Sequence, residues 1–565
     1  MPVSPAPRTG ALAVLLAAVA VAGCATAPDP ATTPGAVLVE VPAIERPGGE
    51  STAWWFRDGA AQAAARGAMG GRAKNVILFV GDGMSLTTVA AARILEGQRA
   101  GGPGEENRLA WERFPHTALS KTYNTDTQTP DSAGTMTAMA TGVKTRAGVI
   151  SVAPEVARGD CAQALGAPLA TLWQLAAVSG LDAGIVTTTR VTHATPAAAF
   201  THAADRNWEN DTALPEAARA DGCVDIARQL VESPHADRLR VLMGGGRGSF
   251  MPAEQADPEY DDKRGLRLDG RDLVASWKQR HPGGVYAWNA KQLDAAPVDA
   301  PLLALFEPSH MRYEHDRVDD PAGEPDLAAM TRAAIARLSR NPAGYVLLVE
   351  GGRIDHAHHE GNAFRALTDT IAFSRAVHAA AEATSDDDTL ILVTADHAHT
   401  LSFSGYPVRG NPILGKVRGS SGEGDGEGAY ATDGLGLPYT TLNYANGPGY
   451  VGRTDQQPEG PKRHPHPTSG VQPATGRPDL TDVDTEAPHY LQEAIFPLSN
   501  ESHGGEDVGI WARGPGSDAV RGSLEQNAIF HILLQATPRL REAACRAGTC
   551  DANGVPVTPP ALGAR

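Results

Sequence analysis

NVILFVGDG, residues Asn75–Gly83, is an apolar run rich in β-branched residues that ends in glycine and aspartate. A continuous apolar run of this length is typical of a strand buried on both faces, as in a parallel sheet. Similar runs recur, and alanine-rich helical stretches such as 171–180 and 363–383 lie between them; the runs are GIVTTT (184–189), YVLLV (345–349) and TLILVT (389–394). This alternation predicts an α/β fold, a three-layer sandwich whose central, mostly parallel sheet is flanked by helices.

Polar side chains follow three of these predicted strands directly. Asp82 follows the first run, Glu350 follows YVLLV, and Asp396 and His397 follow TLILVT. Open α/β sheets bind ligands outside the carboxyl ends of their strands, so we expect these side chains to converge. A lone carboxylate there could be a turn residue or a cap, but converging buried carboxylates repel one another unless cations pair with them. The pattern therefore favours a metal site.

Further candidate ligands lie in EGGRIDHAHHEG (350–361) and ESHGGED (501–507). Asp355 and His359 are four residues apart and share one face of a helical turn, and His503 lies among glycines. The alternative for the first segment is a solvated helix face. Carboxylate and imidazole ligands without thiolate suit a catalytic zinc ion.

TPDSAGTMTAMATGVKT (129–145) places Ser132 next to Asp131, before small residues that tolerate a helix. Taken alone, the segment favours Ser132 as a helix cap, since serine and aspartate oxygens accept the free N–H groups of a first turn. A helix N-terminus also attracts phosphate groups, and serine becomes an effective nucleophile only when activated. Given the predicted metal cluster, we favour Ser132 as a nucleophile.

Six segments together resemble the alkaline phosphatase family, and the animal (tissue) type more than the short enterobacterial type. The resemblance extends from about Ala53 to Cys550. Its segments are NVILFVGDGMS (75–85), residues 129–145, VTTTRVTHATPAAAFTHAADRNW (186–208), VEGGRIDHAHHEG (349–361), VTADHAH (393–399) and SHGGEDVGIWARGP (502–515).

The resemblance implies two zinc ions and one magnesium ion. The implied ligands are Asp355, His359 and His503 for the first zinc; Asp82, Asp396, His397 and Ser132 for the second; and Asp82, Thr195 and Glu350 for magnesium. Arg206 would clamp two phosphate oxygens, a role that suits the planar, always-charged guanidinium. His193 would lie near the magnesium, where the enterobacterial enzymes carry a carboxylate.

The resemblance also implies a calcium site like that of the animal enzymes. Its ligands would be Glu259, the Phe306 carbonyl, Glu307 and Glu324. The last ligand is usually aspartate in the family, and calcium accepts oxygen ligands flexibly.

The implied activity is hydrolysis of phosphate monoesters to alcohol and inorganic phosphate through a covalent phosphoserine. One alternative is a phosphodiesterase or sulfatase of the same superfamily. Those enzymes often use threonine or a modified cysteine as nucleophile and lack the HAADRNW arginine, so Ser132 and Arg206 favour monoesters. The other alternative is a non-catalytic surface lipoprotein that binds metal or phosphate. The net charge of −17 over 565 residues argues against a nucleic-acid partner.

The N-terminal sequence resembles an export signal. Arg8, a short apolar run and VAGC ending at Cys24 resemble a bacterial lipoprotein signal, which we assign to residues 1–24, although an ordinary secretory signal is the alternative. The chain would then be exported and membrane-anchored through lipid on Cys24, facing the periplasm or the cell exterior. Residues 25–50 are predicted to be a flexible tether.

The other four cysteines are even in number, which suggests two disulfides in an oxidising compartment, with free buried thiols as the alternative. We expect them to pair as Cys161–Cys223 and Cys545–Cys550.

The remaining chain divides by composition. Residues 51–400 read as the phosphatase core with an N-terminal helix, the turn-rich residues 401–497 as an inserted, crown-like subdomain, and residues 498–565 as a return to the core with a disulfide-bearing tail. By resemblance, the insertion and the helix within residues 50–68 would form a homodimer interface. A solvated helix and a loose loop are the alternative.

Overall fold

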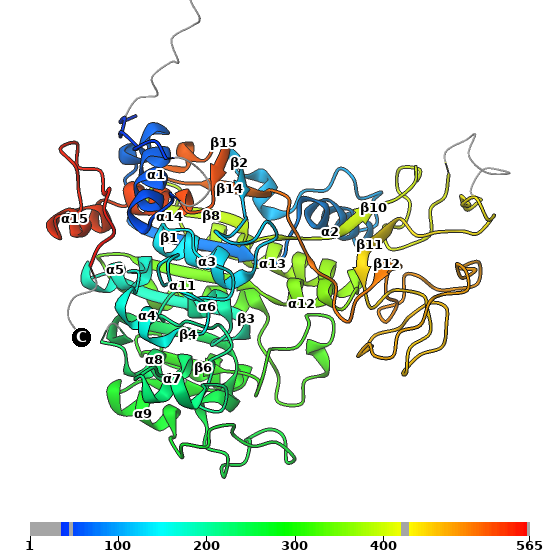
Figure 1. Cartoon of the computed structure of the whole chain (residues 1–565), viewed down its shortest axis with the longest axis horizontal. Helices are drawn as coiled ribbons and strands as arrows, with labels where there is room; N and C mark the ends of the chain where they lie inside the picture. The colour runs from blue at the N-terminus through cyan, green and yellow to red at the C-terminus, as the bar shows by residue number, and fades with distance from the viewer. Residues whose placement is uncertain (1–35, 45–48, 235, 420–428, 562–565) are drawn as a thin grey trace, which may run out of the picture.

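The computed structural model of the chain describes residues 36–44, 49–234, 236–419 and 429–561. Its centre is a ten-stranded sheet (Figure 1). In spatial order the strands are β15 (Gly522–Glu525), β2 (His116–Lys121), β14 (Val508–Arg513), β8 (Thr389–Ala395), β1 (Asn75–Gly81), β7 (Tyr345–Gly351), β3 (Asp182–Arg190), β4 (Leu239–Gly245), β6 (Leu302–Leu305) and β5 (Val285–Ala287). Only β14 runs antiparallel to its neighbours in this sheet; the other adjacent pairs are parallel. The predicted α/β fold is confirmed.

Strand β1 is apolar throughout because both faces of the sheet are covered. All seven of its residues are buried. Val76, Leu78 and Val80 pack into the core on one face, and Ile77 and Phe79 pack into the core on the other. This alternation is the strand period of two.

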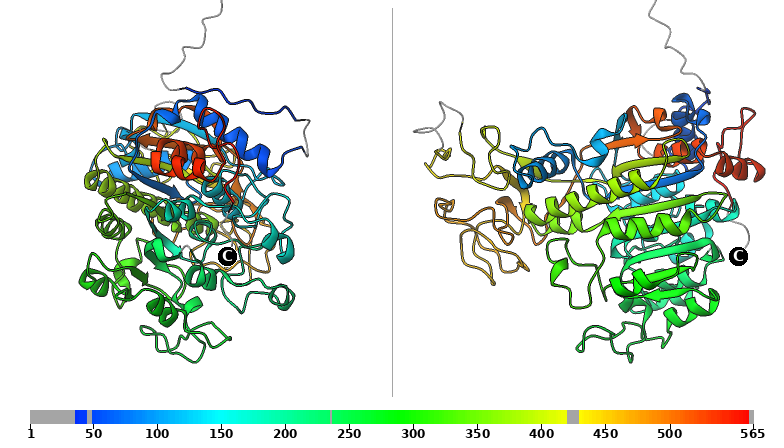
Figure 2. Two further views of the ribbon diagram at one scale, coloured as in Figure 1. Left: turned by 90° about the vertical axis from the view of Figure 1, so that its left-hand side faces the viewer. Right: turned by 180° about the vertical axis from the view of Figure 1, so that it is seen from behind.

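Helices cover both faces, as the two further views show (Figure 2). The helices that contribute to one core are α1 (Thr52–Ala65), α3 (Ser132–Thr141), α4 (Cys161–Gly166), α5 (Leu172–Val178), α6 (Ala194–Ala197), α7 (Glu216–Ala220), α8 (Ile226–Glu232), α9 (Leu273–Arg280), α14 (Ala528–Ala536) and α15 (Pro538–Arg546). Those that contribute to the other are α2 (Leu86–Arg99), α10 (Ala290–Ala295), α11 (Leu327–Leu338), α12 (Arg353–His359) and α13 (Ala363–Ala383). Helix α13 has the predicted bounds, and its cap Asn362 accepts a hydrogen bond from the Arg365 N–H.

Residues 401–497 contain a separate three-stranded sheet, and we refer to them as the insertion. Its strands are β10 (Leu401–Phe403), β11 (Leu442–Gly447) and β12 (Ala494–Pro497), with β11 in the middle. The insertion lies to the right of the large sheet in Figure 1. At its base, β9 (Ala398–His399) pairs antiparallel with β13 (His503–Gly504). The two ends of the insertion therefore lie next to each other.

The predicted signal segment and Cys24 lie outside the described residues, but part of the predicted tether is described. Within the predicted tether, residues 36–44 lie along α1. The Val37 N–H donates to the Ala64 carbonyl at 3.1 Å, and Trp54 Nε1 donates to the Pro42 carbonyl at 2.9 Å. These hydrogen bonds join residues 36–44 to the helix, and the flexibility of the tether stays a prediction. Helix α1 itself packs on α14 of the same chain.

Both predicted disulfides are present, Cys161–Cys223 and Cys545–Cys550. Among the described residues, no helix combines the length and the apolar character that crossing a bilayer requires.

Candidate active site

The predicted carboxylates meet because their strands are neighbours. In the order β8–β1–β7, the parallel ends present Asp396, Asp82 and Glu350 at one edge. All three are fully buried, and within the described part of the chain neither carboxylate oxygen of Asp82 nor Oε1 of Glu350 has a hydrogen-bond partner. Burial, together with the neighbouring carboxylates of Asp396, Asp355 and Glu350, raises the pKa of Asp82 well above its ordinary value. Unpaired buried carboxylates are costly, so these residues fit a site built for cations.

Ser132 lies beside this cluster at the start of α3, and the helix cap is Asp131 instead. The Asp131 side chain accepts from the Gly134 N–H at 3.1 Å. Ser132 Oγ is 3.1 Å from His397 Nε2, and that nitrogen is 3.4 Å from Asp82 Oδ1. Asp82, Asp396 and His397 together form a group able to hold a metal ion. The nucleophile candidate therefore contacts the implied second zinc site.

The implied ligands of the first zinc also converge. His359 Nε2 lies 3.4 Å and His503 Nε2 lies 3.5 Å from Asp355 Oδ1, and the two ring nitrogens are 3.1 Å apart. Nδ1 of His359 faces the Glu501 carbonyl at 2.5 Å, and Nδ1 of His503 faces the Pro130 carbonyl at 2.7 Å. Because a carbonyl only accepts, both protons belong on Nδ1 and both Nε2 lone pairs point to one place. This arrangement of imidazoles is the one that metal ligands require.

His399 and Glu501 also belong to this centre, although the sequence analysis did not select them. His399 Nε2 is 2.7 Å from Asp355 Oδ1, and its Nδ1 contacts the Glu501 carboxylate. Burial opposes a charge on His399, but the two carboxylates prevail and raise its pKa to about 10. A protonated imidazole donates to both carboxylates and cannot ligate a metal. The signal that could have found them is spacing: His399 is two residues after His397, and Glu501 is two before His503.

Thr195 and His193 lie on the other side of Asp82. Asp82, His193 and Glu350 form a group whose ligand atoms lie within 4.8 Å of one another. Thr195 is in the short helix α6 that follows His193, and its buried hydroxyl has no hydrogen-bond partner among described residues. Burial raises the pKa of Glu350 to about 7, against a hydrogen bond from Thr187. Together, these oxygens fit the implied magnesium site.

Arg206 is held at the mouth of the cluster by two partners. Its Nη1 pairs with Asp131 Oδ2 at 3.1 Å, and its Nη2 donates to His193 Nε2 at 3.0 Å. Burial, with the nearby Arg206 charge, lowers the pKa of His193 well below its ordinary value, so the ring is neutral and carries its proton on Nδ1. His193 therefore orients Arg206, and its other ring nitrogen, Nδ1, is buried near Asp82 and Glu350 without a hydrogen-bond partner among the described residues.

The implied calcium group differs from expectation in one residue. Asp320, not Glu324, lies with Glu259 and Glu307, and their ligand atoms are within 4.8 Å of one another. The Glu324 carboxyl instead accepts from the Arg312 N–H at 3.1 Å, and burial raises its pKa to about 9. Asp320 therefore stands in this group in place of the expected Glu324, and the identity of the calcium ligand stays a prediction.

The Phe306 carbonyl, the remaining expected ligand, accepts from Arg247 Nη1 at 2.7 Å. The same guanidinium pairs with Glu259 Oε2 at 2.6 Å. A carbonyl oxygen has two lone pairs, and Glu259 Oε1 is buried without a hydrogen-bond partner in the described ranges. Oxygen atoms therefore remain available for a cation beside Arg247.

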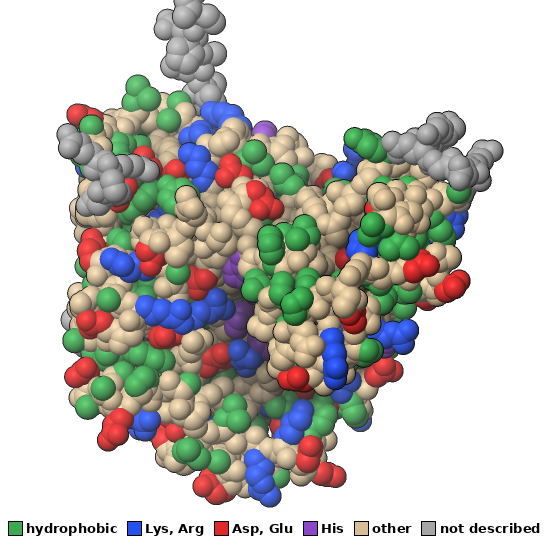
Figure 3. All heavy atoms as spheres, turned by 45° about the vertical axis from the view of Figure 1, so that its right-hand side comes forward, with side chains coloured by type: hydrophobic (Ala, Val, Ile, Leu, Met, Phe, Trp, Pro, Cys, Tyr) green, Lys and Arg blue, Asp and Glu red, His purple; other side chains and the backbone are tan. Residues whose placement is uncertain are grey.

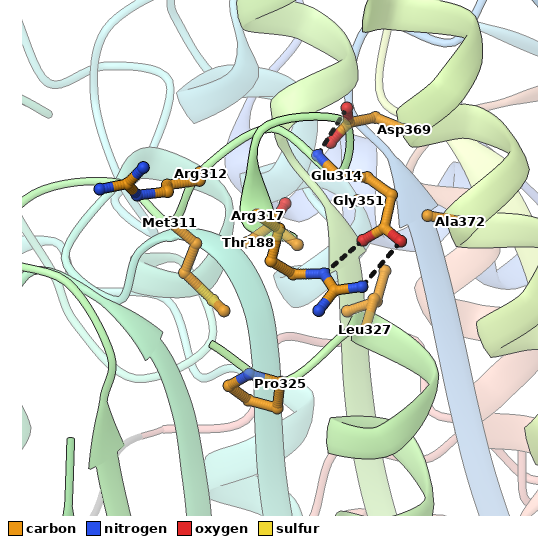
Figure 4. Close-up of a pocket in the computed structure, with 10 residues that line it drawn as sticks. All are labelled: Thr188, Met311, Arg312, Glu314, Arg317, Pro325, Leu327, Gly351, Asp369 and Ala372. Carbon is orange, nitrogen blue, oxygen red and sulfur yellow. Dashed lines mark hydrogen bonds and ion pairs between the residues drawn. The ribbon is translucent and has the colours of Figure 1, made fainter. Parts of the chain in front are cut away.

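Histidine side chains are visible in the cleft between the large body and the lobe that the insertion forms (Figure 3). A separate small cavity is lined in part by Thr188 of β3 and Gly351 of β7 (Figure 4). Its volume is about 10 Å³, which suits a single water, and the ion pair between Glu314 and Arg317 lies along it. None of the implied ligands lines this cavity, whereas histidine side chains are visible in the open cleft.

Comparison with known proteins supports the family that the sequence segments and the site residues indicate. Residues 73–538 match the alkaline phosphatase family. The chain is 44% identical to the tissue-nonspecific alkaline phosphatase of Felis catus over 474 residues, which cover 82% of this chain and 83% of that protein. It is 43% identical to the Homo sapiens protein over 475 residues, with the same coverage.

Solved structures agree. Thermus thermophilus alkaline phosphatase superposes with a TM-score of 0.56 at 27% identity, covering 83% of this chain and 92% of that one. The enzyme from the Antarctic bacterium TAB5 gives a TM-score of 0.51 at 20% identity, covering 83% and 98%, and supports the fold alone. The chain therefore belongs to the alkaline phosphatase family and is a zinc- and magnesium-dependent phosphomonoesterase.

Proposed function

We propose that Ser132 is the nucleophile of this phosphomonoesterase and that three metal sites lie around it. The first zinc would be held by Asp355, His359 and His503; the second by Asp82, Asp396 and His397 next to Ser132; and magnesium by Asp82, Thr195 and Glu350. The observation that carries the proposal is the 3.1 Å contact between Ser132 Oγ and His397 Nε2 beside the unpaired Asp82 carboxylate.

The reaction has two steps. Ser132 Oγ loses its proton to solvent and attacks phosphorus, the Oγ–P bond forms, and the bond from phosphorus to the ester oxygen breaks as the alcohol leaves with a proton. Water then attacks the phosphoserine, which releases inorganic phosphate and restores Ser132. When bound, the metal ions supply positive charge that favours ionised oxygen nucleophiles and leaving groups. Arg206, held by Asp131 and His193, binds two of the phosphate oxygens.

The direct test is hydrolysis of an aryl phosphate monoester and the matching diester at alkaline pH, before and after chelation and return of zinc and magnesium. We expect metal-restorable monoester turnover that exceeds diester turnover. Faster diester turnover would place the chain among the phosphodiesterases. Bound zinc without any turnover would indicate a binding protein.

Replacing Arg206 by lysine should lower kcat/KM for the monoester by about 10- to 100-fold. The change keeps the charge but removes one of two charge-assisted hydrogen bonds to phosphate, each worth ~1.5–3 kcal/mol. Arg158→Lys is the matched control, because Arg158 makes a bidentate pair with Asp205 at the surface. Steady-state kinetics decide the point, and equal effects in the two variants would contradict the phosphate clamp.

The chain also binds calcium through Glu259, Glu307 and Asp320. At calcium 100-fold above Kd, binding stabilises a folded protein by ~2.7 kcal/mol. Calcium should therefore raise the melting temperature of the wild type and of Glu324→Gln, but not of Asp320→Asn. Thermal melts with and without calcium test this assignment. A calcium effect lost in Glu324→Gln and kept in Asp320→Asn would restore Glu324 as the ligand.

The protein forms a homodimer through the insertion. Phe403 on β10 and Ile495 and Phe496 on β12 are exposed, with 43%, 70% and 62% of their surface accessible. Exposed apolar side chains often mark interfaces, and these three lie on the two edge strands of one small sheet. Light scattering should give a particle of twice the chain mass, and Ile495→Glu with Phe496→Glu should give a monomer; a monomeric wild type would sink the assignment.

The protein is exported and anchored by lipid on Cys24. The support is the signal-like sequence of residues 1–24 and the two disulfides, which form in oxidising compartments. Fractionation should find the wild type with membranes and Cys24→Ser in the soluble exported fraction. Equal partitioning of the two would exclude the anchor.

A further inference from the structure

Strand β11 of the insertion makes hydrogen bonds to three segments around the implied first zinc site. They are α12, which carries Asp355 and His359; the β9–β10 turn at Thr400; and Ser502, which directly precedes His503. The contacts are made by three consecutive residues of β11. They form an inner scaffold behind the ligands, because the side chains involved contact neighbours of the ligands and not the ligands themselves.

The first contact reaches α12 through His358. The Tyr444 hydroxyl is 2.7 Å from His358 Nδ1, and His358 Nε2 is 3.0 Å from the hydroxyl of Thr88 in α2. Tyr444, His358 and Thr88 are each fully buried. His358 directly precedes the implied ligand His359. The two ring nitrogens of His358 contact groups from different elements, Tyr444 in β11 and Thr88 in α2. Removing the Tyr444 hydroxyl would leave a buried ring nitrogen unpaired.

The second contact reaches the β9–β10 turn. The Ala445 N–H donates to Thr400 Oγ1 at 3.3 Å. Thr400 in turn donates through its backbone N–H to Glu501 Oε1 at 2.6 Å. Glu501 is the residue whose carbonyl accepts from His359 Nδ1.

The third contact reaches the segment before His503. Asn446 Nδ2 donates to Ser502 Oγ at 3.0 Å, and the Ser502 N–H donates back to Asn446 Oδ1 at 2.9 Å. Gly447 then lets the strand approach closely: a Cβ at this position would lie 2.9 Å from Glu501 Cβ, and its φ is +131°. The reciprocal pair fixes the backbone that orients His503.

From these contacts we infer that Tyr444 and Asn446 are positioning residues of the first zinc site, so that the insertion sets the affinity of that site. This inference rests on the ligand assignment of the proposed function. Partners behind metal ligands typically change metal affinity by 10- to 100-fold when they are removed. Among the described residues, no hydrogen bond joins β11 to the second zinc group, Asp82, Asp396 and His397, so the affinity of that group should be unaffected.

The test uses zinc-loaded, full-length protein and measures zinc release to a chelator, together with zinc content by mass spectrometry. In Tyr444→Phe and in Asn446→Ala, one zinc per chain should leave about 10-fold faster than in the wild type, and the other at the wild-type rate. The control is Tyr490→Phe, since Tyr490 is buried in the same insertion and its hydroxyl has no hydrogen-bond partner among the described residues. The control should release both ions at wild-type rates.

Three outcomes would overturn the inference: unchanged release in both variants, equal acceleration for both ions, or the same acceleration in Tyr490→Phe. If Tyr444→Phe does not fold, Asn446→Ala alone decides, because its side chain is only partly buried. A wild type that holds no zinc would instead refute the proposed ligand assignment. That result is separate, since it appears before any variant is compared.

Discussion

Replacing Ser132 by alanine lowers the turnover of phosphate monoesters by a factor on the order of 10³ or more. Removing a nucleophile closes the covalent route and leaves only the slower attack of water, helped by the remaining charges of the site. The loss should appear in kcat, because Arg206 and the metal cluster still bind the phosphate group. Steady-state kinetics on an aryl phosphate, in zinc- and magnesium-loaded protein, measure the effect.

The matched control is Ser120→Ala. Ser120 is a fully buried serine in β2 whose hydroxyl has no hydrogen-bond partner in the described structure, and its removal should leave turnover unchanged. A second readout is independent of rate: acid quenching after incubation with labelled phosphate should trap label on Ser132 of the wild type and none on Ser132→Ala. Turnover within tenfold of the wild type, or label trapped on the variant, would remove Ser132 from the mechanism.

The contribution of Glu350 and His399 to the stability of the metal-free protein falls as pH rises from about 5 to 9. Burial raises the pKa of Glu350 to about 7, and the flanking carboxylates of Glu501 and Asp355 hold the pKa of His399 near 10. In both cases the native state binds more protons than the unfolded state above the ordinary pKa values, so the free energy of unfolding falls as pH rises. Protonation of Glu350 alone, a shift from 4.5 to about 7, corresponds to about 3 kcal/mol. Asp355, whose pKa is lowered, titrates below this window, whereas buried histidines with lowered pKa values, such as His193 and His397, act in the opposite direction below pH 6.5.

Zinc and magnesium should flatten this profile and give their largest stabilisation at alkaline pH, because they neutralise the same carboxylates. Calorimetric melts at several pH values, with and without metals, give both curves. The sharpest variant is Asp82→Asn, which removes one repelling carboxylate. It should raise the melting temperature of the metal-free protein at pH 9 and abolish most of the gain from metals. A metal-free melt that is independent of pH would contradict the electrostatic account.

The strands were predictable because burial on both faces leaves a continuous apolar signal. The same signal predicted the convergence of Asp82, Glu350 and Asp396, since adjacent parallel strands end at the same edge. The direction of β14 was not predictable, because the apolar run of residues 508–513 is compatible with either orientation. The antiparallel direction of β14 follows from its pairing with β8 and β2, which only the folded structure shows.

The contacts behind and around the metal ligands were the least predictable part of the structure. The role of His399 depends on which group faces each ring nitrogen, and both partners, Asp355 and Glu501, are remote in sequence. The choice between Asp320 and Glu324 depends on the path of a loop that has no periodicity. Residues 36–44 make hydrogen bonds through their backbone, namely the Val37 N–H and the carbonyls of Glu40 and Pro42. Side-chain composition does not reveal such bonds.

Because β9 pairs with β13, the insertion is a separable unit of the fold. His503 lies opposite His399 in this pair, so the chain leaves the core and returns to it at adjacent points. The entropy of closing such a loop grows only slowly, by about 0.6 kcal/mol for each doubling of its length. A change in the length of this lobe should therefore cost the catalytic body little, provided that the altered segment still places a central strand at the same position.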